Sequence, residues 1–134
     1  MEDKLKTIEF IKNQLELFVG EPSTFEEIKI AENVLSVSFS KEYKNYLSQF
    51  GFAVFKGHEL TGLCNGKRLD VVKITQLEKS CLKEINKSWY VIEQTNVDGI
   101  VIWQDSAGFV YQVDRNGKIQ NKFLSIYDFL IKTN

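Results

Sequence analysis

The chain has 134 residues, with 17 basic and 18 acidic residues, and is 43% hydrophobic and 13% aromatic. This length suits one domain with its own core, and the apolar content argues against a disordered chain. The net charge of −1 speaks against a nucleic-acid-binding protein, which usually carries a basic stripe, so we expect no direct contact with nucleic acid. We therefore treat residues 1–134 as a single domain.

The N-terminus and the cysteines predict the compartment. The first residues, Met-Glu-Asp-Lys-Leu-Lys, are charged and lack the apolar run of a signal peptide. No stretch approaches the ~20 apolar residues that a membrane span needs. The two cysteines, Cys64 and Cys81, are too few for a disulfide scaffold, and Cys81 falls on an apolar helical stripe. We expect reduced thiols in a cytoplasmic protein without membrane contact.

The first predicted element is a helix over residues 3–18. Apolar residues recur there at steps of three and four, which is one face of a helix. Gly20 and Pro22 are expected to end it. The apolar face consists of Leu5, Ile8, Ile11, Leu15 and Phe18.

The second predicted helix covers residues 25–35 and has two possible start signals. Ser23 with Glu26, or Thr24 with Glu27, fits a capping box. In this motif the hydroxyl and the carboxylate accept hydrogen bonds from backbone N–H groups that lack helical partners.

The third predicted helix covers residues 41–50. Ser40 is a good N-cap, and Gly51 can end the helix in the left-handed conformation. We expect Leu47 and Phe50 to anchor this helix beneath the sheet.

The middle of the chain predicts two short strands and a helix. Apolar runs at 52–55 and 59–63 indicate strands, and Asn65-Gly66 indicates a turn. The helical period then returns, and we place a helix from about Ile74 to Ile85. The β-branched residues just before Ile74 equally suit a strand.

The last third of the chain predicts an antiparallel meander. Tight turns at Asp98-Gly99, Gly108 and Asn116-Gly117 separate β-rich segments, and strands joined this closely must be antiparallel neighbours. The fold class is therefore α+β, an antiparallel β-meander sheet packed with the N-terminal helices, a mid-chain helix and a short C-terminal helix. The predicted strands are 89–95, 100–104, 109–113 and 118–122, and the closing helix is 125–132.

Few residues suggest catalysis. His58 lies close to Cys64 in the sequence, so one reading is a Cys–His nucleophilic pair, and the other is an exposed loop histidine with an unreactive thiol. The chain shows no phosphate-binding glycine loop and no nucleophile-elbow serine. One histidine and two cysteines do not supply a zinc site without carboxylates. We expect no enzyme, no catalytic residue, no metal and no cofactor.

Four acidic residues lie on or beside the ends of the meander strands, namely Glu93, Asp98, Asp105 and Asp114. One reading is turn chemistry, because Asp bonds its own backbone in tight turns. A second is paired carboxylates that perform acid–base work or hold Mg²⁺ or Ca²⁺. A third is an acidic surface offered to a basic partner.

The predicted strand 100–104 is apolar on both faces. Ile100 and Ile102 occupy one face, and Val101 and Trp103 occupy the other. Such a strand is either covered on both sides or leaves an apolar face exposed. Because tryptophan often anchors protein interfaces, Trp103 is a candidate contact residue.

The order of these motifs resembles the SUKH superfamily. Its usual entry motif is an acidic helix, a linker ending in Leu-Pro, and a Tyr-rich helix ending in Asn-Gly-Gly, which Ser23–Gly51 resembles. Phe39-Ser40 stands in place of Leu-Pro, and Phe50-Gly51-Phe52 in place of Asn-Gly-Gly. Further likeness lies in Asp70–Thr75, Trp89–Ile92, Asp98–Ile102, Gly108–Tyr111 and Ser125–Leu130.

The resemblance implies a function in protein binding. The superfamily includes the yeast Smi/Knr cell-wall regulators and many bacterial toxin-immunity proteins. An immunity protein would bind and neutralise a cognate polymorphic toxin, for example a basic nuclease domain. The expected contact residues are then Glu93, Asp98, Trp103, Asp105 and Asp114. The alternatives are a stand-alone cytosolic regulatory or scaffold module and a small-ligand pocket between helices and sheet.

Overall fold

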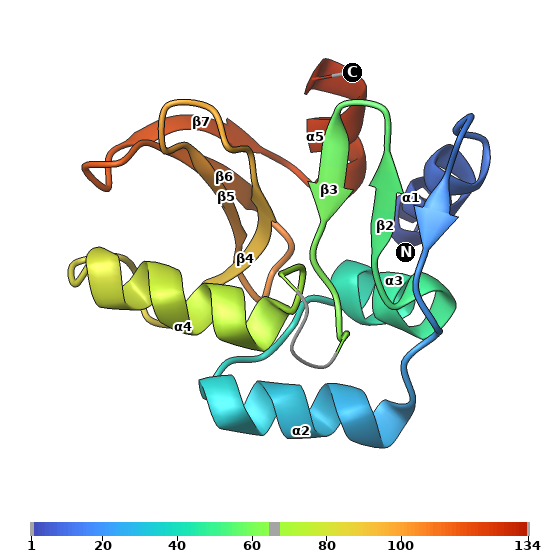
Figure 1. Cartoon of the computed structure of the whole chain (residues 1–134), viewed down its shortest axis with the longest axis horizontal. Coiled ribbons are helices and arrows are strands. Elements are labelled where there is room, and N and C mark those ends of the chain that lie inside the picture. Colours follow the sequence, from blue (N-terminus) through green and yellow to red (C-terminus); the bar gives the residue numbers. More distant parts are fainter. Residues whose placement is uncertain (1, 65–67, 134) are drawn as a thin grey trace.

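The computed structural model describes residues 2–64 and 68–133 and shows a twisted antiparallel sheet with helices on both faces (Figure 1). Within the described residues the sheet has seven strands, which lie side by side in chain order. The strands are β1 (Phe18–Val19), β2 (Ala53–Phe55), β3 (His58–Leu60), β4 (Tyr90–Gln94), β5 (Val101–Gln104), β6 (Val110–Val113) and β7 (Ile119–Phe123). The helices are α1 (Glu2–Lys12), α2 (Phe25–Leu35), α3 (Lys41–Phe50), α4 (Val71–Cys81) and α5 (Ile126–Thr133).

The sheet separates two cores. On one face, Ile92 and Ile102 pack with residues of α1, α3 and α5. On the other face, Val91 and Trp103 pack with Ile74 of α4. The helix α2 contacts both α3 and α4 and lies below the sheet in Figure 1. None of the helices in the described part of the chain has the length and hydropathy of a membrane span.

The predicted meander is confirmed. Residues 90–123 form four consecutive strands, each antiparallel to the next. Gly117 adopts φ 86°, a left-handed conformation that suits glycine in the tight β6–β7 turn. The turn chemistry alone therefore predicts this half of the sheet correctly.

The predicted helices 25–35 and 41–50 are confirmed to within a residue at each end. Thr24 forms the capping box, because its hydroxyl accepts from Glu27 N (3.1 Å) and its N–H donates to Glu27 Oε1 (2.8 Å). Ser40 caps α3 by accepting from Tyr43 N at 2.9 Å. Leu47 and Phe50 are buried against the sheet, as expected.

The prediction of a helix through residue 18 is wrong. The helix α1 ends at Lys12, and Glu16 then adopts the left-handed φ of 57°. Phe18 pairs with Val54 in the sheet, so a tertiary contact replaces the last helical turn. Leu15, expected on the apolar face, is 85% exposed.

The mid-chain helix is shifted from its predicted position. It begins at Val71, because the Asp70 side chain caps it by accepting from Lys73 N at 3.2 Å, and it ends at Cys81. The strand predicted at 59–63 is His58–Leu60. The turn predicted at Asn65-Gly66 lies outside the described residues.

A buried carboxylate joins several elements. Glu42 of α3 accepts hydrogen bonds from Ile126 N (2.8 Å) and Tyr127 N (3.1 Å) at the start of α5. It also accepts from the Thr7 hydroxyl (2.6 Å) and the Gln104 amide (3.1 Å). Burial raises the pKa of Glu42, although these hydrogen bonds oppose the rise. Glu42 thus connects α1, α3, α5 and β5.

Candidate functional site

The predicted acidic contact residues do not form one surface. Asp98 lies between β4 and β5, and Asp114 lies between β6 and β7. Because neighbouring strands run in opposite directions, these two connections share one end of the sheet. Arg115 of the second connection donates to the Asp98 carbonyl at 3.4 Å. Asp105, between β5 and β6, lies at the opposite end.

Asp105 and Asp114 stabilise their own turns. Asp105 Oδ1 accepts from three backbone N–H groups at 2.9–3.0 Å, and its Oδ2 accepts from the Tyr111 hydroxyl at 2.8 Å. Asp114 Oδ1 accepts from Asn116 N (2.9 Å) and Lys118 N (3.0 Å). Burial, together with the Asp105 carboxylate, raises the pKa of Tyr111 to about 12. The first interpretation, that these aspartates stabilise tight turns, therefore holds for both Asp105 and Asp114.

Two of the predicted contact residues, Trp103 and Glu93, are buried, which corrects the prediction that they face a partner. Both faces of β5 are covered, and Trp103 packs with Val91 and Ile74. Glu93 lies on β4 and is directed at β3. Neither side chain can reach a partner while the fold is intact.

Glu93 forms a buried pair with the only histidine. His58 Nδ1 lies 3.0 Å from Glu93 Oε1, and Glu59 N donates to Glu93 Oε2 at 2.7 Å. His58 Nε2 lies 3.3 Å from the Thr133 hydroxyl. Both ring nitrogens thus face groups other than the Cys64 thiol, and His58 lies in a strand rather than an exposed loop. Across residues 2–64 and 68–133, no three His, Cys, Asp or Glu side chains gather as metal ligands.

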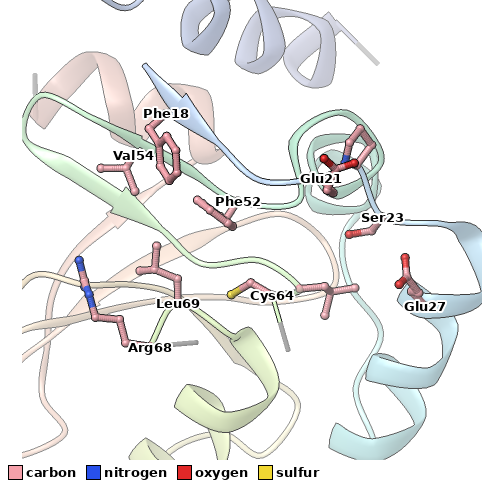
Figure 2. A pocket seen from close by; sticks show the side chains of 11 residues that line it. Phe18, Glu21, Ser23, Glu27, Phe52, Val54, Cys64, Arg68 and Leu69 are labelled. Atoms are coloured by element: carbon pink, nitrogen blue, oxygen red, sulfur yellow. The ribbon is translucent and has the colours of Figure 1, made fainter. Parts of the chain in front are cut away.

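A hollow with a volume of about 710 Å³ lies between the sheet edge and the start of α2 (Figure 2). We call it the β1–α2 groove. Phe18 of β1 and Val54 of β2 are directly paired, so both side chains lie on the same sheet face. The centroids of the Phe18 and Phe52 rings lie 5.8 Å apart. Leu63 and Leu69 complete the apolar lining.

Close backbone packing fixes the far wall of the groove. Leu63 N donates to Gly51 O at 2.9 Å, and Gly62 N donates to Leu69 O at 2.8 Å. A Cβ on Gly62 would lie 1.3 Å from Gly51 O, so only glycine allows this approach. The end of α3 therefore positions Leu63 opposite β1.

The rim of the groove is acidic. Glu21 and Glu27 line one side. Arg68 lies on the other side but forms a bidentate pair with Glu59 at 2.6 and 2.9 Å. This pair lowers the pKa of Glu59 and raises that of Arg68. Arg68 is therefore compensated, and among the described lining residues the two carboxylates give this rim its negative charge.

A buried hydroxyl and a thiol also line the groove. Ser23 is 7% exposed, and its Oγ has no hydrogen-bond partner among the described residues. Figure 2 shows this hydroxyl directed toward the side where Cys64 lies. Cys64 and Cys81 are not joined by a disulfide, and Cys81 is exposed rather than on a buried stripe.

The sequence does not predict this groove. Its lining comes from three separate stretches, and the helical period extends to Phe18, where the first stretch begins. One signal was present, because Phe18-Val19 directly precedes Gly20 and Pro22, which suits a short edge strand as well as a helix end.

Comparisons with known proteins agree with this architecture. A family model, SUKH_5, described as SMI1-KNR4 cell-wall, matches residues 1–132. A crystal structure of a protein from Pseudomonas syringae pv. tomato has the same fold, with a TM-score of 0.75 and 10% sequence identity. The alignment covers 98% of this chain and 96% of that chain. No curated protein matches the sequence.

Proposed function

This chain belongs to the SUKH_5 family, and we propose that it is an immunity protein that binds and neutralises a cognate bacterial toxin in the cytoplasm of the producing cell. Neutralisation requires a complementary surface and no chemistry of the protein's own, so we propose that the chain is not an enzyme. A toxin domain that acts on nucleic acid is a suitable partner, because such domains tend to be basic around their active sites.

The observation that carries this proposal is the β1–α2 groove. It combines an exposed apolar wall with an acidic rim, and interfaces often combine buried apolar anchors with polar surroundings. Phe18 is 65% exposed on this wall. Large exposed apolar side chains that gather at a hollow commonly mark a binding surface.

Asp98 remains a proposed contributor from the meander. It is exposed, and its loop lies away from the groove. An exposed carboxylate at such a position acts mainly on the rate of encounter with a basic partner. We therefore assign Asp98 to steering and the groove to the contact itself.

The alternative function is a stand-alone regulatory or scaffold module. The description of the matching family, SMI1-KNR4 cell-wall, favours this reading. A regulatory module would bind a housekeeping protein or peptide and would have no toxin gene beside its own.

The test is co-expression with the protein encoded next to this chain. Wild-type chain should restore growth of cells that produce this toxin. Phe18→Asp should lose protection, because a charge on the apolar wall would be buried against the partner without compensation. The measurement is growth rate at matched expression of both proteins.

Leu124→Asp is the matched control, because Leu124 is 67% exposed and does not line the groove. It should protect as well as wild type. Equal protection by Phe18→Asp would show that another surface binds the toxin. If wild type neither protects nor binds the neighbouring gene product, the regulatory reading replaces the immunity reading.

A further inference from the structure

We infer that the β1–α2 groove accepts an extended segment of the partner protein in which apolar side chains alternate with lysine or arginine. This inference rests on the proposed function in one respect, namely that the chain acts by binding a protein. It names the chemistry of the bound segment, which the family match and the fold leave open.

The groove is longer than one side chain needs. A second hollow of about 340 Å³ shares Glu27 and Leu63 with the first and continues along α2 toward α4. Ile30 and Val34 line this continuation and are 62% and 54% exposed. The two hollows are neighbours that share lining residues, and together they offer room for more than one apolar side chain of a partner.

The geometry of β1 favours an extended segment. Gly20 N donates to Phe52 O at 3.1 Å, so the Gly20 N–H faces β2. Because the backbone groups of successive strand residues point to opposite sides, the N–H and C=O of Val19 point away from β2. No strand of the described chain pairs with that side of β1. A partner strand can therefore add at this edge and place alternate side chains over the groove.

The charge of the rim favours a basic segment. Glu27 accepts a hydrogen bond from Thr24 N as part of the capping box, whereas Glu21 is exposed and its carboxylate has no partner among the described residues. Arg68 is already paired with Glu59. Successive side chains of an extended segment point to opposite faces, so lysine or arginine between the apolar residues would attract these carboxylates across the edge of the segment rather than by direct contact. Acidic residues at the same positions would be repelled.

The Ser23 hydroxyl is an independent indication of a ligand. A buried hydroxyl without a partner is unfavourable, and such a group calls for an explanation in a native structure. Ser23 Oγ lines the groove with less than a tenth of the residue exposed. A backbone or side-chain group of the bound segment would satisfy it.

The test uses purified full-length chain and two labelled peptides, acetyl-Val-Lys-Phe-Lys-Val-Lys-amide and acetyl-Val-Glu-Phe-Glu-Val-Glu-amide. Fluorescence anisotropy at low salt should show that wild type binds the lysine peptide about tenfold more tightly than the glutamate peptide. Phe18→Ser and Glu21→Lys should each weaken binding of the lysine peptide about fivefold or more.

Two surface variants serve as matched controls. Leu124→Ser removes an equally exposed apolar side chain, and Glu84→Lys reverses an exposed charge outside the groove. Both should change the affinity by less than about twofold. Ser23→Ala should weaken peptide binding while leaving the melting temperature unchanged, because no hydrogen bond within the described chain is lost.

Several outcomes would overturn the inference. These are equal affinity for both peptides, no binding of either, or equal weakening by the control variants. Dimerisation that Phe18→Ser abolishes would identify a second copy as the occupant. If the peptides fail while co-expression still protects and Phe18→Asp loses protection, the proposed function stands and only the inferred chemistry of the bound segment is wrong.

Discussion

Replacing Trp103 with alanine is expected to lower the free energy of unfolding by about 3–5 kcal/mol, near the upper end for a core substitution. The indole is fully buried in β5, with Val91 and Tyr111 as its neighbours on the adjacent strands. Its removal leaves a cavity between the sheet and α4 that the surrounding backbone cannot close. Urea titration followed by circular dichroism measures the loss.

Trp103→Phe is the informative companion variant. Trp103 Nε1 has no hydrogen-bond partner among the described residues, so phenylalanine removes volume without breaking a hydrogen bond. It should destabilise clearly less than alanine does. A loss below about 1 kcal/mol for Trp103→Ala would show that the indole is not a core residue. If Trp103→Phe abolished partner binding in a fully folded protein, the earlier reading of Trp103 as an anchor would return.

Replacing Glu42 with alanine is expected to lower the free energy of unfolding by about 3 kcal/mol or more, because several buried donors lose their acceptor at once. Ile126 N and Tyr127 N, at the first turn of α5, would have no replacement partner in the core. We expect α5 to detach before the sheet unfolds. Hydrogen exchange in α5, compared with that in β5, measures this order.

Glu42→Gln keeps the shape of the side chain but removes its titratable carboxyl group, so it separates the effect of ionisation from that of packing. Burial raises the pKa of Glu42 above its ordinary value of 4.5. When the pKa of a group is higher in the folded state than in the unfolded state, the group stabilises the fold in its protonated form. This stabilisation is complete at pH values below the unfolded-state pKa and is lost as the pH rises through the folded-state pKa. The unfolding free energy of wild type should therefore fall with rising pH above 4.5 relative to that of Glu42→Gln. A difference between the two proteins that does not vary with pH would contradict this assignment.

Local signals predict much of the fold. The helices α2 and α3 follow from Thr24, Glu27 and Ser40, whose side chains bond to backbone groups only three residues away. The meander follows from turns that join adjacent strands directly. Both kinds of signal involve residues that are close in the sequence, so the sequence alone is enough to predict these elements.

The end of α1 could not be predicted in the same way. The spacing of Leu15 and Phe18 continues the helical period, and this spacing does not distinguish them from Ile8 and Ile11. Phe18 joins the sheet because it meets Val54, far along the chain. Tertiary pairing overrides local periodicity here, and the groove depends on this pairing.

The burial of two of the expected contact residues could not be predicted, for a related reason. Trp103 is buried because α4 covers its face of the meander. Glu93 is buried because β3 pairs with β4 and places His58 against it. The helix α4, which covers Trp103, begins at Val71, whereas the β-branched residues before Ile74 suited a strand equally well. Whether a strand that is apolar on both faces is covered on both depends on packing with distant elements, which the strand's own sequence does not determine.

The most direct test of the central claim, that the chain binds a protein partner through the β1–α2 groove, is amide hydrogen exchange of the chain alone and in complex with the protein encoded beside it. We predict slower exchange in the complex in the segments 18–23 and 52–54, which contain lining residues of the groove such as Phe18, Ser23 and Phe52. Exchange at the meander loops 96–99 and 115–117 should stay unchanged. Slower exchange confined to those loops, or to any surface away from the groove, would contradict the claim.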